Sequence, residues 1–250
     1  PANPNRKTRY RQLAPAVGDL GFDEQGRLKE AMPAHNEMSD AVFMACPILA
    51  ETAKHTGEAK YSRMALAHFD FMRKLTVRPD GIYRHSPLCE AAWGRGNGFP
   101  ALGLAWSLSA LPSDDPAVPA LRTAFQNHVA ALVPHQDPAG CWHQVIDDPK
   151  SYREFTATCM ITFAMIRGVR EGWLEEAAYR PVIEKAFDAV KTRIAPNGSL
   201  IDVCTGTGKQ QTLSDYYDRK AILGSDARGG AMALLVTTEM ARWQRERARN

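Results

Sequence analysis

Two kinds of apolar pattern alternate along the chain, both at the spacing of an α-helix. In the first kind, apolar residues surround the segment on nearly every side, and Ala, Gly and Met are frequent. In the second kind, apolar residues occupy one face and polar residues the other. Helices of the first kind are predicted at 39–55, 98–111 and 152–172, those of the second kind at 58–75, 116–133 and 176–194, and one more helix, 226–248, closes the chain.

Four short segments between these helices resemble one another: FDEQGRL, RPDGIYRH, DPAGCWHQ and APNGSLID. Each places Asp, Pro or Asn before a glycine and continues into a short extended run, which is typical of a tight turn. Their glycines, Gly26, Gly81, Gly140 and Gly198, are 55, 59 and 58 residues apart. A recurring period of this size indicates one supersecondary unit used repeatedly.

Apolar helices that alternate with amphipathic ones predict an all-α fold, a toroid in which inner helices line a cavity and outer helices face solvent. We expect residues 1–250 to form a single domain, with the glycine turns together at one rim. A closed ring of this type commonly has six hairpins, whereas the pattern gives seven helices, and residues 1–20 resemble at most a remnant of an outer helix. We therefore expect the N-terminal helices of the ring to be missing.

The composition excludes several classes of function. With 44% hydrophobic residues, 24% charged residues and a net charge of +3, the chain is typical of a globular protein. Its basic ending, ARWQRERARN, is best interpreted as a solvated helix end, and we expect no nucleic-acid partner. No apolar run approaches the roughly 18 residues of a membrane span, so we expect no membrane partner.

The cysteines give no sign of a metal centre. The five are far apart and form no CxxC pair, which favours buried free thiols: Cys46, Cys89, Cys141, Cys159 and Cys204. We expect no metal and no cofactor. No signal peptide is visible, and the chain begins at Pro1 without Met, so we expect a bacterial-type cytoplasmic or periplasmic protein, with the cytoplasm favoured. The sequence does not fix the oligomeric state.

The stretch AAWGRGNGF, residues 91–99, concentrates hydrogen-bonding chemistry among three glycines. Trp93 supplies an indole, Arg95 a guanidinium and Asn97 an amide, directly before an apolar helix. Because each glycine inside a helix costs up to about 1 kcal/mol relative to alanine, we expect these glycines to bring the backbone close to a ligand. GRGNG does not match the dinucleotide motif GxGxxG, VCTGTGKQ lacks two residue types that a P-loop requires, and no GxSxG is present.

Further candidates lie just after the repeat glycines or at the start of predicted inner helices, where the toroid places them at one mouth. Asp40 precedes the first apolar helix; capping would explain an Asp here, but Ser39 caps equally well, which leaves Asp40 for the cavity. His85 and His143 follow the second and third turns at similar places. Trp142 offers an aromatic face of the kind that stacks on a sugar, with core packing as the alternative.

Several segments together resemble a known family. SDAVFM, DGIYRHS, WGRGNGF, GCWHQVIDDP, VCTGTG, DYYDR and GSDARGGAMALL are similar to motifs of the unsaturated glucuronyl and rhamnogalacturonyl hydrolases, glycoside hydrolase families 88 and 105. The resemblance covers about residues 20–245, and its most specific element is the pairing of WGRGNGF with WHQVIDDP. These enzymes are (α/α)6 barrels, in agreement with the repeat.

The resemblance implies a substrate and a mechanism. The substrate is an oligosaccharide whose non-reducing end carries a 4,5-unsaturated uronic acid left by a polysaccharide lyase. An acid protonates C4, water adds at C5, and the hemiketal opens to release the neighbouring sugar, unlike the usual two-carboxylate route. By motif match, Asp40 is the general acid and base, and His85 is the histidine near the double bond. The expected substrate-binding residues are Trp93, Arg95, Asn97, Phe99, Trp142 and His143.

The sequence departs from the family pattern at some positions, and two alternatives stay open. Phe99 stands where the family often has Trp, Lys220 replaces a frequent Pro, and a second Asp from earlier helices has no counterpart. One alternative is another α/α-toroid carbohydrate enzyme: a lyase, which needs a Tyr/His pair, or an ordinary glycosidase, which needs two carboxylates. The other is a non-catalytic sugar-binding relative. The sequence does not select the uronic acid or the aglycone sugar.

Overall fold

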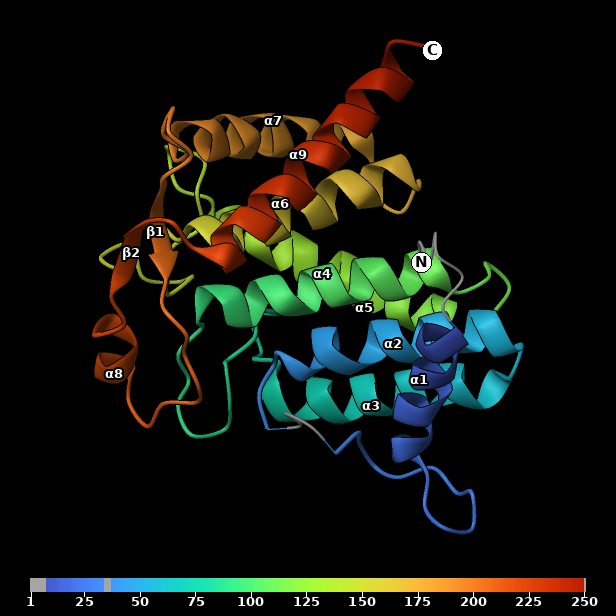
Figure 1. Cartoon of the computed structure of the whole chain (residues 1–250). Coiled ribbons are helices and arrows are strands. Elements are labelled where there is room, and N and C mark those ends of the chain that lie inside the picture. The colour runs from blue at the N-terminus through green and yellow to red at the C-terminus, as the bar shows by residue number, and fades with distance from the viewer. Residues whose placement is uncertain (1–7, 34–36, 250) are drawn as a thin grey trace.

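The computed structural model describes residues 8–33 and 37–249 and is mostly helical (Figure 1). In chain order its elements are α1 (Thr8–Gly18), a 3-10 turn (Asp19–Gly21), α2 (Ala41–Thr56), α3 (Ala59–Thr76), α4 (Gly94–Ala110), α5 (Val118–Leu132), a 3-10 turn (Val133–His135), α6 (Phe155–Arg170), α7 (Glu176–Thr192), β1 (Leu200–Cys204), α8 (Leu213–Tyr217), β2 (Ala221–Gly224) and α9 (Ala227–Arg247). None of the helices in these described residues is long and apolar enough to cross a membrane.

All seven helices expected from the hydrophobic pattern are present, and nearly all their ends lie within three residues of the expected positions. The exception is α4, which begins at Gly94 and therefore contains the glycine-rich motif as its first turn. Helix α1 lies within the expected remnant of an outer helix, whose residues 1–7 fall outside the described part of the chain. The strand β1 begins in the extended run expected after Gly198, whereas the short helix α8 and the strand β2 were not expected from the pattern.

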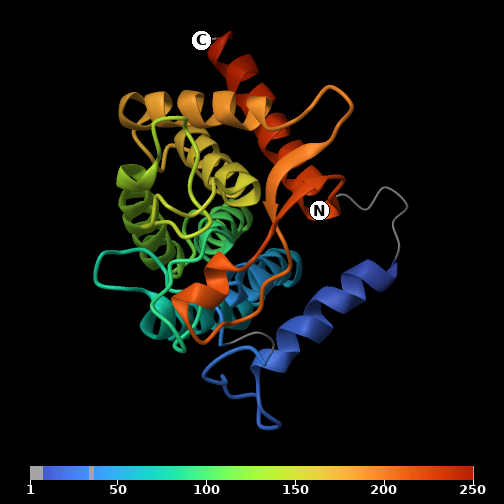
Figure 2. The same cartoon turned by 90° about the vertical axis from the view of Figure 1, so that its left-hand side faces the viewer.

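Burial separates inner from outer helices clearly in the second and third hairpins, and only slightly in the first, where 9 of 16 residues of α2 and 8 of 18 of α3 are buried. Buried residues make up 14 of 17 positions in α4 and 14 of 16 in α6, but only 6 of 15 in α5 and 4 of 17 in α7. Each of the outer helices α3, α5 and α7 packs on the inner helix that precedes it. The inner helices pack in a row, α2 on α4 and α4 on α6, and α9 continues this row by packing on α6, although only 5 of its 21 residues are buried (Figures 1 and 2). The described residues thus form an arc of helical hairpins.

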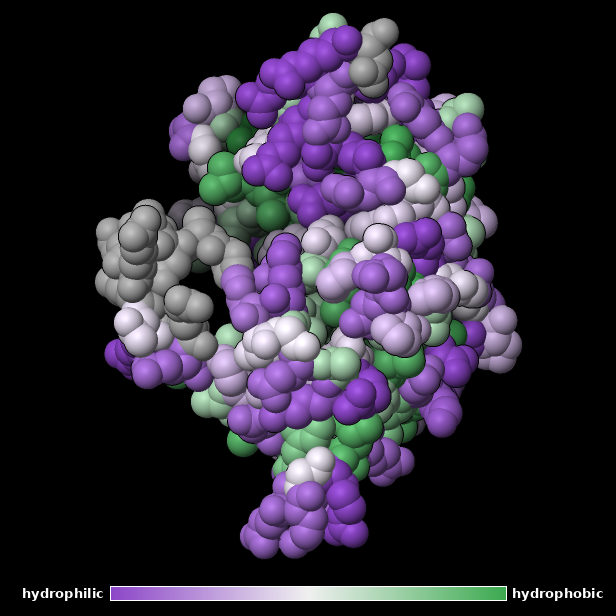
Figure 3. Space-filling model, turned by 90° about the vertical axis from the view of Figure 1, so that its right-hand side faces the viewer, coloured by the Kyte–Doolittle hydropathy of each residue, from purple (hydrophilic) through white to green (hydrophobic). Residues whose placement is uncertain are grey.

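The inner helices all begin on the same side of the molecule. Their N-terminal ends lie on the left in Figure 1, beside β1, β2 and α8, and Figure 2 looks directly onto this side. Strand β1 pairs antiparallel with β2, with Val203 opposite Ile222. Figure 3 shows the opposite side, where hydrophilic residues dominate and hydrophobic residues appear in patches between them. The loops that precede the inner helices therefore meet at one end of the arc.

The four repeat turns share one hydrogen-bonding pattern. The amide of Gly81 donates to Arg78 O at 3.0 Å, and the amide of Arg78 donates to Ile82 O at 2.9 Å. The same two bonds recur at the turns of Gly26, Gly140 and Gly198. All four glycines have φ between +74° and +97°, the left-handed region that glycine adopts without steric cost. The periodicity in the sequence is therefore a true structural repeat.

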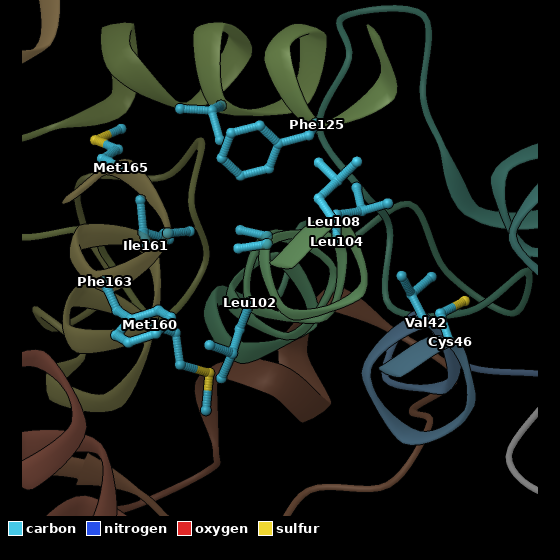
Figure 4. Close-up of a cluster of buried hydrophobic side chains, with 14 of the residues drawn as sticks. Val42, Cys46, Leu102, Leu104, Leu108, Phe125, Met160, Ile161, Phe163 and Met165 are labelled. Atoms are coloured by element: carbon cyan, nitrogen blue, oxygen red, sulfur yellow. The ribbon is translucent and has the colours of Figure 1, made fainter. Parts of the chain in front are cut away.

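The hydrophobic core lies between the inner helices and the outer helices that cover them (Figure 4). Leu102 of α4 points toward Met160 of α6, on the side of α4 away from α5, whereas Leu104 and Leu108 lie toward Phe125 of α5. Small residues allow the close spacing: a Cβ on Gly103 would stand 2.7 Å from the Cα of Phe43 in α2. All five cysteines are free, as expected, and four are buried, with Cys89 half-buried.

Candidate active site

The loops before α2 and α4 bring Asp40 and His85 together. Asp40 Oδ2 lies 3.0 Å from His85 Nε2, and the two atoms are not aligned for a hydrogen bond. Asp40 directly precedes α2, yet its side chain makes no capping hydrogen bond to the helix. The His85 ring is fully buried, whereas 12% of the Asp40 side chain is exposed. The carboxyl group is therefore the member of this pair that a ligand from solvent reaches first.

The backbone fixes this pair in place. The amide of Ser39 donates to His85 O at 2.9 Å, and the amide of His85 donates to Ala91 O at 3.1 Å. These bonds connect the start of α2 to the loop that leads into α4. Two segments that are 45 residues apart in the chain are thus held side by side.

His85 has a second neighbour, Tyr216, to which the sequence analysis assigned no role. Tyr216 of α8 places its hydroxyl 2.8 Å from His85 Nδ1, on the side of the ring away from Asp40. Tyr216 is fully buried, and burial raises the pKa of its phenol to about 12. The only sequence signal was the motif DYYDR, in which nothing distinguishes Tyr216 from Tyr217.

Trp93 and Arg95 are buried beside His85 in this structure. The Trp93 ring lies 4.4 Å from the His85 ring between centroids, and the Arg95 guanidinium lies 4.7 Å from the Trp93 ring. Arg95 donates to the carbonyls of Cys204 and Thr205, the latter at 2.8 Å, and stands 3.9 Å from Glu154. Trp93 and Arg95 therefore pack behind His85, and the hydrogen bonds of Arg95 hold the end of β1 next to this part of the site.

The glycines of this stretch allow close packing between protein segments. A Cβ on Gly94 would stand 2.7 Å from the carbonyl oxygen of His143, and one on Gly98 would stand 3.0 Å from Met160 in α6. The amide of Gly94 donates to Gln144 O at 2.7 Å. The glycines therefore allow α4 to approach α6 and the 143–144 segment, and their expected approach to a ligand stays a prediction. This packing also explains why α4 begins four residues earlier than predicted.

Asn97 and Trp142, both expected to bind substrate, have structural roles instead. The Asn97 amide accepts from Tyr83 N at 2.7 Å and donates to Tyr83 O and Trp93 O at 2.8 and 3.0 Å. The Trp142 indole donates to Leu132 O at 2.8 Å. Both side chains are fully buried, so neither has surface or a free polar atom for a ligand.

His143 and Phe99 lie near the same end of the arc in different surroundings. His143 Nε2 lies 3.5 Å from Asp137, which also pairs with Arg153, so its polar partners differ from those of Asp40. Phe99 is half-buried, and its ring lies 5.2 Å from that of Phe43. Phe99 is therefore the aromatic candidate that keeps exposed surface, on an aromatic wall shared by α2 and α4.

Unpartnered polar atoms are concentrated around this mouth. Among the residues that the structure describes, eight have a buried side-chain nitrogen or oxygen without a hydrogen-bond partner. Six of the eight belong to this group: Ser39, Asp40, His85, Trp93, Gln144 and Tyr152. Buried polar atoms are normally paired, so such a concentration is typical of a site that binds a polar ligand. Across the described ranges, no three His, Cys, Asp or Glu side chains are grouped to hold a metal ion.

Comparison with known proteins indicates the same family as the sequence motifs. The family model described as Glycosyl Hydrolase Family 88 matches residues 3–244. Unsaturated rhamnogalacturonyl hydrolase YesR of Bacillus subtilis is 28% identical over 124 residues, which are 50% of this chain and 34% of that protein. Unsaturated 3S-rhamnoglycuronyl hydrolase of Alteromonas sp. is 26% identical over 252 residues, which are 92% of this chain and 58% of that protein.

A solved structure with a similar fold agrees with this family assignment. The crystal structure described as a possible member of the GH105 family from Salmonella enterica superposes with a TM-score of 0.80 at 27% identity. The match covers 96% of this chain and 67% of that chain. The α/α-toroid architecture expected from the repeat is thus confirmed over most of the chain. This chain spans about a third to two thirds of the length of these relatives.

Proposed function

The chain belongs to glycosyl hydrolase family 88, and on that premise we propose that it hydrolyses oligosaccharides that end in a 4,5-unsaturated uronic acid. The observation that carries the proposal is the Asp40–His85 pair, 3.0 Å apart and surrounded by unpartnered buried polar atoms. The relatives named for unsaturated rhamnogalacturonyl and 3S-rhamnoglycuronyl substrates support this substrate class.

In the proposed reaction, Asp40 is both the acid and the base. Its protonated carboxyl group transfers the proton to C4, and the electrons of the C4–C5 double bond form the new C–H bond. The positive charge at C5 is shared with the ring oxygen. Water then adds at C5 and gives its proton to the Asp40 carboxylate, which restores the carboxyl group. The exposed edge of Asp40 provides the access that both steps require.

The neighbouring sugar leaves after the hydration. The bond between C5 and the ring oxygen breaks, which leaves a ketone at C5 and a hemiacetal at C1. The hemiacetal collapses to an aldehyde and releases the sugar as an alcohol, so one water is consumed in total. His85 lies next to the Asp40 oxygen throughout, and we assign it the role of orienting that carboxyl group.

The test is an absorbance assay with lyase products. The double bond is conjugated with the uronate carboxylate, so its ultraviolet absorbance falls when water adds. A panel of unsaturated disaccharides that differ in uronic acid and aglycone is incubated with the protein, with saturated analogues as controls. We expect the absorbance to fall and the free sugar to appear for at least one member. No loss with any member contradicts the proposal.

A second candidate, a polysaccharide lyase, is favoured by one observation, the His85–Tyr216 pair at 2.8 Å. A lyase uses such a pair to remove the C5 proton and creates the double bond, so absorbance rises on a saturated polysaccharide. Tyr216 is fully buried, which gives its hydroxyl no contact with a substrate in this structure. We therefore rank the hydrolase first, and the sign of the absorbance change separates the two. A non-catalytic sugar-binding protein changes absorbance in neither direction.

A further inference from the structure

Tyr216 is a buried tyrosine that the proposed reaction does not use. It lies in α8, 131 residues after His85, and its ring packs with Trp93, Val145 and Cys204. The side-chain amide of Gln144 donates to Tyr216 O at 2.7 Å, which ties the backbone of α8 to the segment behind the mouth. Helix α8 also begins with a capping box formed by Thr212 and Asp215. The hydroxyl is thus held at a defined point.

The hydrogen bonds of the hydroxyl determine where its proton lies. Its oxygen accepts a hydrogen bond from the backbone amide of Gln210 at 3.3 Å, and its other partner is His85 Nδ1 at 2.8 Å. A buried O–H needs an acceptor, and since the Gln210 amide is itself a donor, His85 Nδ1 is the partner among the described residues that can accept the proton of the hydroxyl. A ring nitrogen that accepts a hydrogen bond carries no proton. The proton of a neutral His85 then lies on Nε2, the nitrogen nearest Asp40.

We propose that Tyr216 is a positioning residue, whose hydroxyl holds His85 in the tautomer protonated on Nε2 and so keeps an N–H donor beside the Asp40 carboxyl group. The opposite tautomer would place a nitrogen lone pair against the carboxylate, which repels it. An N–H donor instead stabilises the carboxylate that remains after Asp40 gives up its proton. This catalytic consequence rests on the proposed function; the tautomer itself does not.

The chain offers a matched pair of variants. Tyr216→Phe removes the hydroxyl and keeps the ring that packs on Trp93. Tyr217→Phe removes the hydroxyl of the next residue, which is exposed and contacts Asp148 at the surface. The readouts are the 15N chemical shifts of the His85 ring at neutral pH, melting temperature, and kcat and KM over a pH series with an unsaturated disaccharide.

We expect the parent and Tyr217→Phe to show His85 protonated on Nε2, and Tyr216→Phe to show a mixture of tautomers. In Tyr216→Phe we expect kcat to fall about tenfold, the rate equivalent of one hydrogen bond, with a displaced pH profile and little change in KM. A structural role alone would lower the melting temperature and leave the pH profile unchanged.

Two results overturn the proposal: a parent protein with His85 protonated on Nδ1, or a Tyr216→Phe protein whose His85 spectrum and pH profile match the parent. The parent spectrum decides the tautomer even if the variant does not fold. A parent with the expected tautomer and no turnover on any unsaturated substrate counts against the proposed function and leaves the positioning of His85 supported.

Discussion

At the scale of the residue, Asp40 and Asp226 both stand directly before a helix of the inner row, but only Asp226 caps its helix. Asp226 precedes α9 and accepts a hydrogen bond from the amide of Gly229 at 2.8 Å, so it caps that helix. Asp40 precedes α2 and accepts no such bond. A side-chain cap contributes typically about 1 kcal/mol to stability. Helix α2 lacks this contribution, and the Asp40 carboxyl group stays next to His85 instead.

Replacement of Asp40 therefore affects activity more than stability. We expect Asp40→Asn to lower turnover of an unsaturated disaccharide by about 10²–10⁴-fold, since the amide neither donates the C4 proton nor accepts one from water. We expect its free energy of unfolding to change by about 1 kcal/mol or less, because no capping bond is lost and the amide keeps an oxygen that can face His85. Absorbance assays and urea unfolding measure the two effects. Turnover within a few-fold of the parent would assign Asp40 a role other than the acid.

The capping residue supplies the control. Asp226→Ala is expected to cost about 1 kcal/mol of unfolding free energy, because the amide of Gly229 loses its acceptor. Asp40→Ala is expected to cost less. If both alanine variants lose the same stability, the difference that we assign to the two positions is incorrect.

At the scale of the element, the repeat turns are alike in hydrogen bonding but differ in what surrounds them. A Cβ on Gly26 would meet no atom within 4 Å, whereas a Cβ on Gly140 would clash with the carbonyl oxygen of Lys185 in α7. Both glycines have positive φ, +74° and +97°. The backbone cost of alanine is therefore present at both, and the steric cost at only one.

Alanine substitution at the two turns separates these costs. Gly26→Ala is expected to lose about 1–2 kcal/mol, the cost of a left-handed residue with a Cβ. Gly140→Ala is expected to lose a further 1–3 kcal/mol or so, because the turn has to move away from α7. Urea unfolding of the two variants gives the comparison. Equal losses would show that the turn of Gly140 moves without cost.

Helix α9 joins the row of inner helices through a buried ionic cluster. Glu239 is buried between Arg167, whose nitrogens lie 2.5 and 2.8 Å from its carboxylate oxygens, and Arg170. Arg170 also pairs with Glu246, which is about half exposed. Removal of one partner from such a cluster leaves a buried charge uncompensated, which is more costly than loss of an exposed pair.

We expect Glu239→Gln to destabilise the protein by about 3–5 kcal/mol, with α9 the first element to gain amide exchange. Glu246→Gln removes an exposed partner of the same arginine and is expected to cost less than about 1 kcal/mol. Hydrogen exchange and thermal unfolding measure both. A Glu239→Gln protein as stable as Glu246→Gln would show that apolar packing alone holds α9 on α6.

At the scale of the whole molecule, the arrangement of helices decides where distant segments meet. The inner helices begin on one side, and the segment after β1 lies across it, tied by Arg95 to Cys204 and Thr205. Lys209 pairs with Glu37 and so joins this segment to the one before α2. The candidate site thus draws on most of the chain, and its formation depends on complete folding.

The same arrangement buries two histidines and two carboxylates whose pKa values are lower in the folded chain than in the unfolded chain. These four groups make the stability depend on pH. His68 accepts from Met32 N at 3.1 Å, and burial lowers its pKa; burial also lowers the pKa of His128. Burial opposes ionisation of Asp137 and Glu239, but their arginine partners outweigh it and lower both pKa values. In all four groups the unfolded chain binds protons more readily than the folded chain, so stability falls as pH decreases.

We expect the loss of stability to occur in two ranges. The histidines contribute as pH falls through about 6.5, and the carboxylates contribute as it falls below about 4.3, their ordinary pKa values. Urea unfolding at a series of pH values from 8 to about 2 tests this, with His68→Gln as a variant in which the first loss is smaller. A free energy of unfolding that stays constant between pH 8 and 5 would contradict the role of the two histidines.

The sequence by itself determined the features that depend on local patterns. Helical periodicity located the seven helices. Residues three and four positions apart lie on the same face of a helix, so the spacing of apolar residues shows which faces are buried. The repeat glycines marked turns because their backbone conformation favours glycine. The positions of Asp40 and His85 relative to these elements also predicted that the two lie at one mouth, and the structure places them 3.0 Å apart.

Only the tertiary structure decided the features that depend on contacts between distant segments. The start of α4 at Gly94 is set by packing on the 143–144 segment and α6, which outweighs the low helix propensity of glycine. Arg95 holds carbonyls more than 100 residues away, and Trp142 packs in the core, roles that no local pattern distinguishes from substrate binding. Tyr216 reaches His85 across 131 residues because α8 docks over the ends of the inner helices, and that docking is a property of the assembled toroid.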